Sequence, residues 1–302
     1  MTNIKYQISD LQSALLAAYP EDEARSLAWW IMEELTGKSR TELQFGCKDT
    51  TFSPIMQEKS QEIISRLLHF EPIQYIFGHT LWCGLDLLVT PATLIPRPET
   101  AELVETIVNN FNRQSIVNRK SFNRQLNVLD IGTGSGCIAI SLKKAHPDWQ
   151  VTGIDISPEA IEVAKENAKR NGVEVEFKIA DIFDSNEENL QSSIFNLQYD
   201  IVVSNPPYIC ESEKSSMRPN VLDHEPASAL FVPDNDPMLY YRPIAAYAGR
   251  ALKNGGHLYL EINRTMAAQV SDTLMRASLR NIQVYNDFNG NNRFVTATKI
   301  TD

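Results

Sequence analysis

The first part of the chain carries apolar residues every three or four positions, which is the spacing of an amphipathic helix. Three segments show this spacing: 11–19, 23–35 and 53–70. Gly37 follows the second segment as a stop signal, and Ser53 with Pro54 is typical of a helix start in which the serine is the N-cap. We therefore predict a helical domain over residues 1–75.

A shorter, alternating pattern follows in GHTLWCGLDLLV, residues 78–89. This alternation around Gly84 predicts a β-hairpin, and we assign residues 76–95 to a hairpin linker. The proline-rich stretch TLIPRPET then precedes a helix predicted from Glu99 to Phe111. The second domain is expected to occupy residues 96–302.

From Leu126 onward, apolar strand patterns alternate with helical ones. The predicted strands are 127–132, 151–156, 173–181, 199–205, 257–262, 281–288 and 293–300, and the predicted helices are 137–145, 158–170, 238–253 and 265–279. This alternation predicts an α/β domain with a mainly parallel sheet and helices on both faces. Only the segment 289–292 joins the last two strands, which is too short for a crossover, so that pair is predicted to be antiparallel.

Composition and charge narrow the classes of partner. The 302 residues contain 28 Lys and Arg against 38 Asp and Glu, a net charge of −10, which disfavours direct binding to nucleic acid or to an anionic membrane. The chain starts without a signal peptide pattern and has no apolar run long enough to span a bilayer, so we expect a cytoplasmic protein. The four cysteines lack zinc-ligand spacing, so we expect reduced thiols and no metal. We also expect a monomer, because no exposed heptad pattern is evident.

A glycine-rich loop follows the first strand of the second domain. The stretch LNVLDIGTGSG places five small residues between this strand and the next helix: Gly132, Thr133, Gly134, Ser135 and Gly136. Glycines let the backbone approach a ligand closely, and a helix start offers unpaired N–H groups. Asp155 ends the next strand, where a carboxylate accepts hydrogen bonds from both hydroxyls of a ribose. This combination predicts a nucleoside-containing cofactor, with a tight structural turn as the alternative.

The glycine spacing bears on which cofactor this is. The spacing is G-x-G-x-G and not the G-x-G-x-x-G of nicotinamide enzymes. Dinucleotide-binding folds are built from two mononucleotide-binding halves, and this chain has only one. S-adenosylmethionine fits better, since it contains ribose and adenine but no phosphate. Asp181, at the end of the third strand, is either an acceptor for the adenine amino group or a turn residue, and the sequence alone does not decide between them.

The motif NPPYI, beginning at Asn205, stands at the carboxyl end of the fourth strand, where such sheets bind ligands. The side-chain oxygen of Asn205 and the carbonyl of Pro206 form two fixed acceptors that hold a planar –NH₂ group and favour its attack on an electrophilic methyl group, mainly through orientation and electrostatics. Tyr208 is expected to close the pocket against water. The alternative is a Pro-Pro strand stop followed by a packed tyrosine.

These motifs, in this order, resemble the HemK/PrmC family of protein-(glutamine-N5) methyltransferases over nearly the whole chain. TLIPRPET, DIGTGSG and NPPYI carry the resemblance, together with ESEKSSMRPNVLDHEPASALFVPD, LKNGGHLYLEI and NGNNRFVTATK. The resemblance implies a class I S-adenosylmethionine-dependent methyltransferase fold, with a Rossmann-like seven-stranded sheet and an antiparallel last strand. It also implies a class 1 peptide chain release factor as substrate, methylated on the glutamine of its Gly-Gly-Gln motif, with S-adenosylhomocysteine as the second product.

The resemblance also implies roles for individual residues. Residues 132–136 would cradle the methionine part of the cofactor, Asp155 would bind its ribose, and Asp181 with Ile182 its adenine. The family often has an aromatic residue after the acid, whereas this chain has Ile182 and then Phe183, so either side chain could flank the adenine. The remaining implied roles are contact with both cofactor and substrate for Asn205, a glutamine pocket for Pro206, Pro207 and Tyr208, and cofactor contacts for Arg97 and Thr100.

Two other functions are open to the same residues. An adenine-N6 methyltransferase acting on DNA or RNA would use the same quartet, because adenine also offers a conjugated –NH₂; the net charge argues against it. A catalytically silent scaffold that binds the cofactor is the other alternative, and the intact Asn205 and Asp155 argue against that. We expect no general base, although His224, Glu225 and Glu261 are titratable, and we expect the helical domain to grip the release factor.

Overall fold

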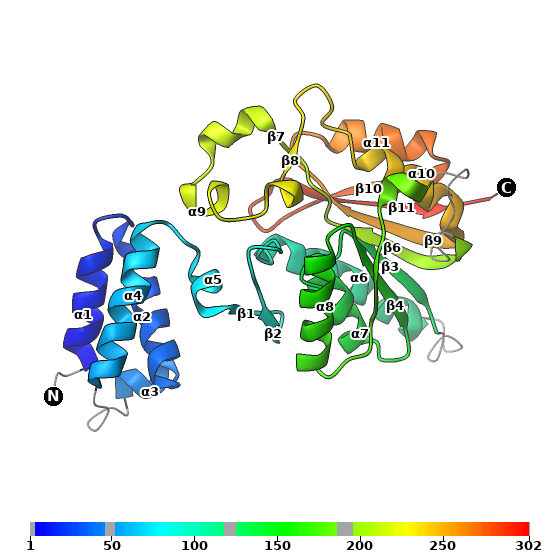
Figure 1. The fold of residues 1–302 in the computed structure, drawn as a ribbon. Helices are drawn as coiled ribbons and strands as arrows, with labels where there is room; N and C mark the ends of the chain where they lie inside the picture. The colour runs from blue at the N-terminus through cyan, green and yellow to red at the C-terminus, as the bar shows by residue number, and fades with distance from the viewer. Residues whose placement is uncertain (1–3, 46–51, 118–124, 186–195, 302) are drawn as a thin grey trace. The chain divides into compact units, whose positions relative to one another are not determined.

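The computed structural model describes residues 4–45, 52–117, 125–185 and 196–301 (Figure 1). The chain divides into two compact units. The smaller comprises Met1–Gly78 together with Arg218–His224, and the larger comprises His79–Met217 together with Glu225–Asp302. Each unit has its own buried apolar core, so each is described by itself.

The smaller unit is helical, as predicted. Its helices are α1 (Ile4–Leu15), α2 (Glu21–Thr36), α3 (Arg40–Phe45), α4 (Pro54–Leu68) and α5 (Ile73–Phe77). The predicted start of α4 is confirmed, because the Ser53 hydroxyl accepts a hydrogen bond from the backbone N–H of Met56 at 3.2 Å. Gly37 ends α2 with a left-handed φ of 63°.

The prediction for the first helix was wrong at both ends. The segment 11–19 was expected to be helical, but α1 begins at Ile4 and ends at Leu15. The apolar residues that follow belong to a turn, where the hydroxyl of Tyr19 donates to the carbonyl of Leu67 at 2.7 Å. Their spacing therefore reflects packing of this turn against α4 and not a continuing helix. The short helices α3 and α5 were not predicted.

A short piece from late in the chain belongs to the smaller unit. Residues Arg218–His224, which contain α9 (Pro219–Leu222), contact the helices through two side chains. The guanidinium of Arg218 donates to both carboxylate oxygens of Glu23 at 2.9 and 2.8 Å, and Nε2 of His224 lies 3.1 Å from the carbonyl oxygen of His69. This segment follows the NPPYI motif in sequence, so the helical unit is built from two separate stretches of chain.

The larger unit contains a seven-stranded sheet. Its strands are β3 (Asn127–Ile131), β4 (Gln150–Asp155), β5 (Glu176–Ile179), β6 (Tyr199–Ser204), β9 (Leu252–Glu261), β10 (Leu279–Asn286) and β11 (Asn292–Lys299). They lie in the order β10-β11-β9-β6-β3-β4-β5. The pairs from β9 to β5 are parallel, whereas β11 runs antiparallel to both β9 and β10. The predicted α/β fold and its antiparallel last pair are confirmed.

Helices cover both faces of this sheet (Figure 1). On one face lie α10 (Tyr241–Ala251) and α11 (Ala267–Arg276), and on the other α6 (Pro98–Val117), α7 (Cys137–Ala145) and α8 (Pro158–Arg170). Alternate residues of one strand enter opposite cores: Leu129 packs in the cluster with α10 and α11, and Val128 in the cluster with α6, α7 and α8. The predicted helix 238–253 extends beyond α10 at both ends. At the C-terminal end, the chain enters β9 at Leu252 directly after the helix.

Two small β-pairs complete the larger unit. The predicted hairpin is present as β1 (His79–Trp82) and β2 (Leu85–Leu88), and it contacts α8 through the buried Asn167. This side chain accepts from the Leu88 N–H at 2.6 Å and donates to the Leu88 carbonyl at 2.9 Å. The other pair, β7 (Ile209–Cys210) with β8 (Phe231–Val232), was not predicted. Among the described helices, none is long and apolar enough to cross a membrane.

Candidate active site

A cavity of about 290 Å³ lies in the larger unit, at the carboxyl ends of β3, β4 and β6. Parallel sheets bind ligands at this edge, where the strand order reverses. Twelve of the sequence-predicted site residues line it: Arg97, Thr100, Gly132, Thr133, Gly134, Ser135, Asp155, Asp181, Ile182, Asn205, Pro206 and Pro207. Gly136 and Tyr208 do not line the cavity.

The glycine loop forms one wall of the cavity. Gly132 and Gly134 have φ values of 70° and 54°, and a Cβ added at either position would meet nothing within 4 Å. The loop is anchored from behind, because the N–H groups of Gly132 and Thr133 both donate to the Ile154 carbonyl at 2.9 Å. The backbone is therefore fixed while its front face stays open to a ligand.

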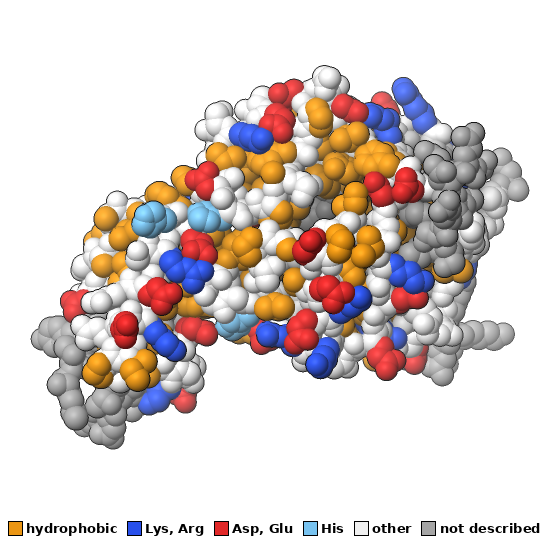
Figure 2. Space-filling model, viewed as in Figure 1, with side chains coloured by type: hydrophobic (Ala, Val, Ile, Leu, Met, Phe, Trp, Pro, Cys, Tyr) orange, Lys and Arg blue, Asp and Glu red, His pale blue; other side chains and the backbone are white. Residues whose placement is uncertain are grey.

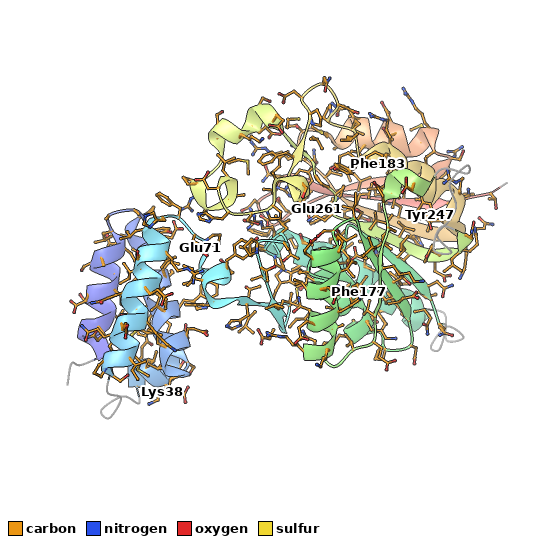
Figure 3. All side chains as sticks on the ribbon, in the orientation of Figure 1. Lys38, Glu71, Phe177, Phe183, Tyr247 and Glu261 are labelled. Atoms are coloured by element: carbon orange, nitrogen blue, oxygen red, sulfur yellow. The ribbon has the colours of Figure 1, made fainter. Side chains whose placement is uncertain are left out.

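Gly136 has a packing role instead. Its φ is 79°, and an added Cβ would lie 3.0 Å from Ile140, 3.1 Å from Ala164 and 3.1 Å from Phe177, which Figure 3 shows in the larger unit. This glycine lets α7 begin close to α8 and β5. The sequence does not distinguish it from the two open glycines, because all three share one motif.

Below the loop lies a buried carboxyl group. Asp130 is fully buried; its Oδ2 accepts from the Thr133 hydroxyl at 2.7 Å, while its Oδ1 has no hydrogen-bond partner among the described residues. Burial raises the pKa of Asp130 to about 7. Asp130 does not line the cavity, so its contact with Thr133 supports the loop from beneath.

Asp155 stands at the end of β4 and faces the glycine loop. One carboxylate oxygen accepts from the Gly134 N–H at 2.8 Å and the other from the Ser157 N–H at 3.0 Å. Burial raises the pKa of Asp155, and these backbone hydrogen bonds oppose that effect. Each oxygen has a further lone pair, so the carboxylate is able to accept further hydrogen bonds.

The far end of the cavity is more apolar. Ile182 is 7% exposed and Phe183 39%, and both line the cavity. The ring of Phe183 lies 5.5 Å from that of Tyr240, measured between centroids. Asp181 accepts from the Phe183 N–H at 2.9 Å, which fixes the turn after β5. Both the acceptor and the turn interpretation of Asp181 therefore fit its surroundings.

A second buried carboxylate holds the TLIPRPET segment. Glu225, whose side chain is 0% exposed, accepts from the Arg97 guanidinium at 2.6 Å and from the Ile95 N–H at 3.2 Å. Because Arg97 lines the cavity, Glu225 orients a cavity wall without lining it. The sequence analysis did not identify this contact.

The NPPYI corner forms the remaining wall. Asn205 follows β6, and its Nδ2 donates to the Thr100 hydroxyl at 3.2 Å. Thr100 donates in turn to Oε2 of Glu261 at 2.7 Å, and the Tyr208 hydroxyl donates to Oε1 at 3.0 Å. Glu261, labelled in Figure 3, lies at the end of β9. Tyr208 thus points to this buried carboxylate and supports the corner from outside the cavity.

Charged side chains are interspersed on the face of the molecule shown in Figure 2, where acidic and basic groups lie among each other in the described residues.

Within the described parts of the chain, no group of three or more His, Cys, Asp or Glu side chains has the arrangement of a metal site. The site therefore consists of a glycine loop, the Asp155 carboxylate, an apolar end and the NPPYI corner.

Comparison with known proteins decides the family. A family model described as a methyltransferase domain matches residues 122–296, and one described as the PrmC N-terminal domain matches residues 8–78. A release factor glutamine methyltransferase of Bacteroides thetaiotaomicron is 40% identical over 289 residues, covering 96% of this chain and 98% of that protein. The chain belongs to the release factor glutamine methyltransferase family.

Further comparisons agree with this family. A release factor glutamine methyltransferase of Flavobacterium psychrophilum is 39% identical, covering 97% of this chain and 98% of that protein. Among solved structures, the hMettl16 catalytic domain has a TM-score of 0.51 at 14% identity, covering 83% of this chain and 82% of that one. This second likeness shows a shared methyltransferase fold alone. The resemblance to the HemK/PrmC family is confirmed.

The hydrogen-bond partners behind the walls were missed by the sequence analysis. Glu225 and Glu261 were considered only as general bases and set aside, whereas the structure gives each a buried contact with a wall residue. Ser204, fully buried, donates to the Ile131 carbonyl at 2.7 Å and ties β6 to β3 just before Asn205. One signal in the sequence could have drawn attention to these two residues. Glu225 and Glu261 lie within the stretches ESEKSSMRPNVLDHEPASALFVPD and LKNGGHLYLEI, which carry the family resemblance.

Proposed function

We propose that this protein transfers the methyl group of S-adenosylmethionine to the side-chain amide N5 of the glutamine in the Gly-Gly-Gln motif of class 1 peptide chain release factors. The observation that carries the proposal is the match over nearly the full length to release factor glutamine methyltransferases. The cavity adds a chemical reason, because Asn205 and Pro206 line the same space as the glycine loop and Asp155.

The residues present fit S-adenosylmethionine. The open faces of Gly132 and Gly134 leave room for the methionine part, Asp155 offers two oxygens to the ribose hydroxyls, and Ile182 with Phe183 offers an apolar surface to the adenine. When bound, the cofactor supplies an electrophilic methyl group. S-adenosylmethionine has no phosphate to be neutralised, which agrees with the two carboxyl groups, Asp155 and Asp181, that line this cavity.

Asn205 and Pro206 would act on the substrate glutamine. A primary amide is a weak nucleophile because its nitrogen lone pair is delocalised. Two acceptors in fixed positions hold both N–H groups and direct the lone pair toward the methyl group, so that orientation and electrostatics supply the rate enhancement. The surplus proton can pass to solvent after transfer, so no general base is required, and both Glu225 and Glu261 are engaged in other contacts.

The helical unit is proposed to bind the release factor, and the whole enzyme to act as a cytoplasmic monomer. A single glutamine at a loop tip offers little selective surface, so affinity for an intact factor needs contacts elsewhere. Truncation is a poor test, since residues Arg218–His224 would lose their partners Glu23 and His69. A better test compares KM for the intact factor with KM for a short Gly-Gly-Gln peptide. Equal values would contradict the docking role.

The proposed activity is tested with methyl-labelled S-adenosylmethionine and three substrates. These are a purified class 1 release factor, the same factor with alanine in place of the Gly-Gly-Gln glutamine, and an adenine-containing nucleic acid. We expect label in the first substrate only. Label in the nucleic acid alone would instead support the adenine-N6 alternative, and cofactor binding without any transfer would support a silent scaffold.

A further inference from the structure

Three segments that are distant in the sequence meet at the Glu261 carboxylate. Glu261 is 1% exposed and Thr100 2%. The Thr100 hydroxyl lies 2.7 Å from Oε2, and the Tyr208 hydroxyl lies 3.0 Å from Oε1. Each oxygen of this buried group is therefore engaged by a different hydroxyl, as burial of a carboxylate requires.

The direction of each hydrogen bond follows from this carboxylate. Burial raises the pKa of Glu261, and the Thr100 and Tyr208 hydroxyls together with the Arg293 charge oppose that rise by stabilising the ionised form. The ionised carboxylate only accepts, so the single hydroxyl proton of Thr100 points to Glu261. The Thr100 oxygen then has only lone pairs left for Asn205, 3.2 Å away. Asn205 must present its –NH₂ to Thr100, and its Oδ1, on the other branch of the same planar amide, is left for the cavity that Asn205 lines.

The second contact of Glu261 supports the same assignment. Burial keeps the pKa of Tyr208 well above its usual value, so its hydroxyl remains a donor. Arg293 donates to the Tyr208 oxygen at 3.4 Å and is itself held by the buried Asp287 at 3.1 Å. Because Arg293 has no acceptor atom, the Tyr208 proton is left for Glu261.

We propose that Glu261 is a positioning residue which, through Thr100, fixes the Asn205 amide with its oxygen toward the substrate nitrogen. The inference rests on the proposed function and extends it to a residue that does not line the cavity. An oxygen is needed at this point because the substrate amide nitrogen only donates. A reversed Asn205 would oppose –NH₂ to –NH₂ and could not hold the glutamine.

The test uses the full-length protein with an intact release factor and a set of matched variants. Thr100→Val keeps the shape of the side chain and removes the hydroxyl, whereas Thr100→Ser keeps the hydroxyl. Glu261→Gln introduces an amide that is able to donate to Thr100. It could therefore reverse the two hydrogen bonds that link Glu261 through Thr100 to Asn205, which we call the relay. The control is Tyr241→Phe, which deletes another buried hydroxyl beside Glu261, one that donates to its backbone carbonyl at 3.3 Å and not to its carboxylate.

For each variant, kcat and KM for the release factor are measured beside the Kd for S-adenosylmethionine and the melting temperature. We expect Thr100→Val to lower kcat/KM by about 10- to 100-fold, because Asn205 loses the contact that orients its amide. Glu261→Gln should lower kcat/KM further, because the amide would then be reversed. Thr100→Ser should recover most of the loss, and Tyr241→Phe should stay within about threefold of wild type. The Kd for the cofactor should change little in all four.

The outcomes separate the two proposals. If the wild-type protein transfers no methyl group to the factor, the proposed function itself fails. If the wild type is active and Thr100→Val stays within about twofold of it, the positioning role is overturned. Equal losses in Thr100→Ser and Thr100→Val would overturn it as well, since shape and not the hydroxyl would then matter. Should Glu261→Gln fail to fold, the pair of Thr100 variants still decides.

Discussion

The glycine-loop wall and the Asn205 corner face the same cavity but are built in different ways. The loop, residues 132–134, is held by backbone hydrogen bonds to the neighbouring strand β4 and by the Asp155 carboxylate. The corner is held by side chains that come from α6, from the end of β6 and from the end of β9. Backbone geometry thus shapes the proposed cofactor cradle, whereas buried side chains hold the Asn205 amide, whose direction we propose they set.

We therefore expect substitutions in the two walls to change different measured quantities. Damage to the corner should appear mainly in kcat, because we propose that its acceptors act on the substrate amide. Damage to the loop or to Asp155 should appear mainly in the Kd for the cofactor. The predictions below are ordered from the largest expected effect to the smallest.

Removal of the Asn205 amide should give the largest loss. In Asn205→Ala one of two orienting acceptors disappears, and we expect kcat to fall by about 100- to 1,000-fold, as for removal of one oriented group at a reaction centre. Single-turnover methyl transfer to the release factor measures this rate. A fall in cofactor affinity as large as the fall in kcat would contradict the division between the walls.

Removal of the Asp155 carboxylate should act on the other wall. Asp155→Ala deletes the acceptor of the Gly134 and Ser157 N–H groups as well as the proposed ribose contact. We expect the Kd for S-adenosylmethionine to rise about 100-fold, which is about 2.7 kcal/mol. Isothermal titration calorimetry measures it, and an unchanged Kd would show that Asp155 only supports the loop.

The glycine motif itself should divide into packing and open positions. Gly136→Ala combines a left-handed φ with a Cβ 3.0 to 3.1 Å from three side chains, so we expect about 2–3 kcal/mol of lost stability. Gly132→Ala, with the same sign of φ but open space, should lose about 1 kcal/mol. Urea denaturation compares the two. Equal losses would mean that backbone strain alone accounts for both.

The smallest effect concerns the carboxyl group beneath the loop. The pKa of Asp130 is raised from 3.8 to about 7, so the folded protein binds more protons than the unfolded chain between these values. Its contribution to stability is therefore complete below about pH 4 and is lost as the pH rises through about 7. In Asp130→Asn this decline should shrink by about 1.4 kcal/mol between pH 6 and pH 8. Denaturation curves at the two pH values measure it, and an identical decline in both proteins would refute the assignment.

The two walls also differ in how far the sequence predicts them. The glycine loop and Asp155 could be placed because they follow consecutive strands, β3 and β4, that pair directly. The corner relay joins Thr100 to Glu261 and Asn205 over 161 and 105 residues, and no local pattern reports which side chains meet at such separations. The sequence therefore identified Asn205 as a cavity residue, but not the Glu261 carboxylate that is linked to it through Thr100.

The helical unit shows the same limit at a larger scale. Apolar spacing predicted its helical content, and the pair Ser53 and Pro54 predicted the N-cap at Ser53; both signals depend on neighbours in sequence. It did not predict that Arg218 and His224 belong to this unit, because their partners Glu23 and His69 lie far away along the chain. It also misplaced the first helix, where the turn at Tyr19 is stabilised by a contact with Leu67.

The most direct test of the account is mass spectrometry of the Gly-Gly-Gln peptide after reaction of the intact release factor with the wild-type protein and with Asn205→Ala. The account predicts one added methyl group, located by fragmentation on the glutamine side chain, and its near-complete loss in the variant. An unmodified glutamine with the wild-type protein, or equal modification by both proteins, would contradict it.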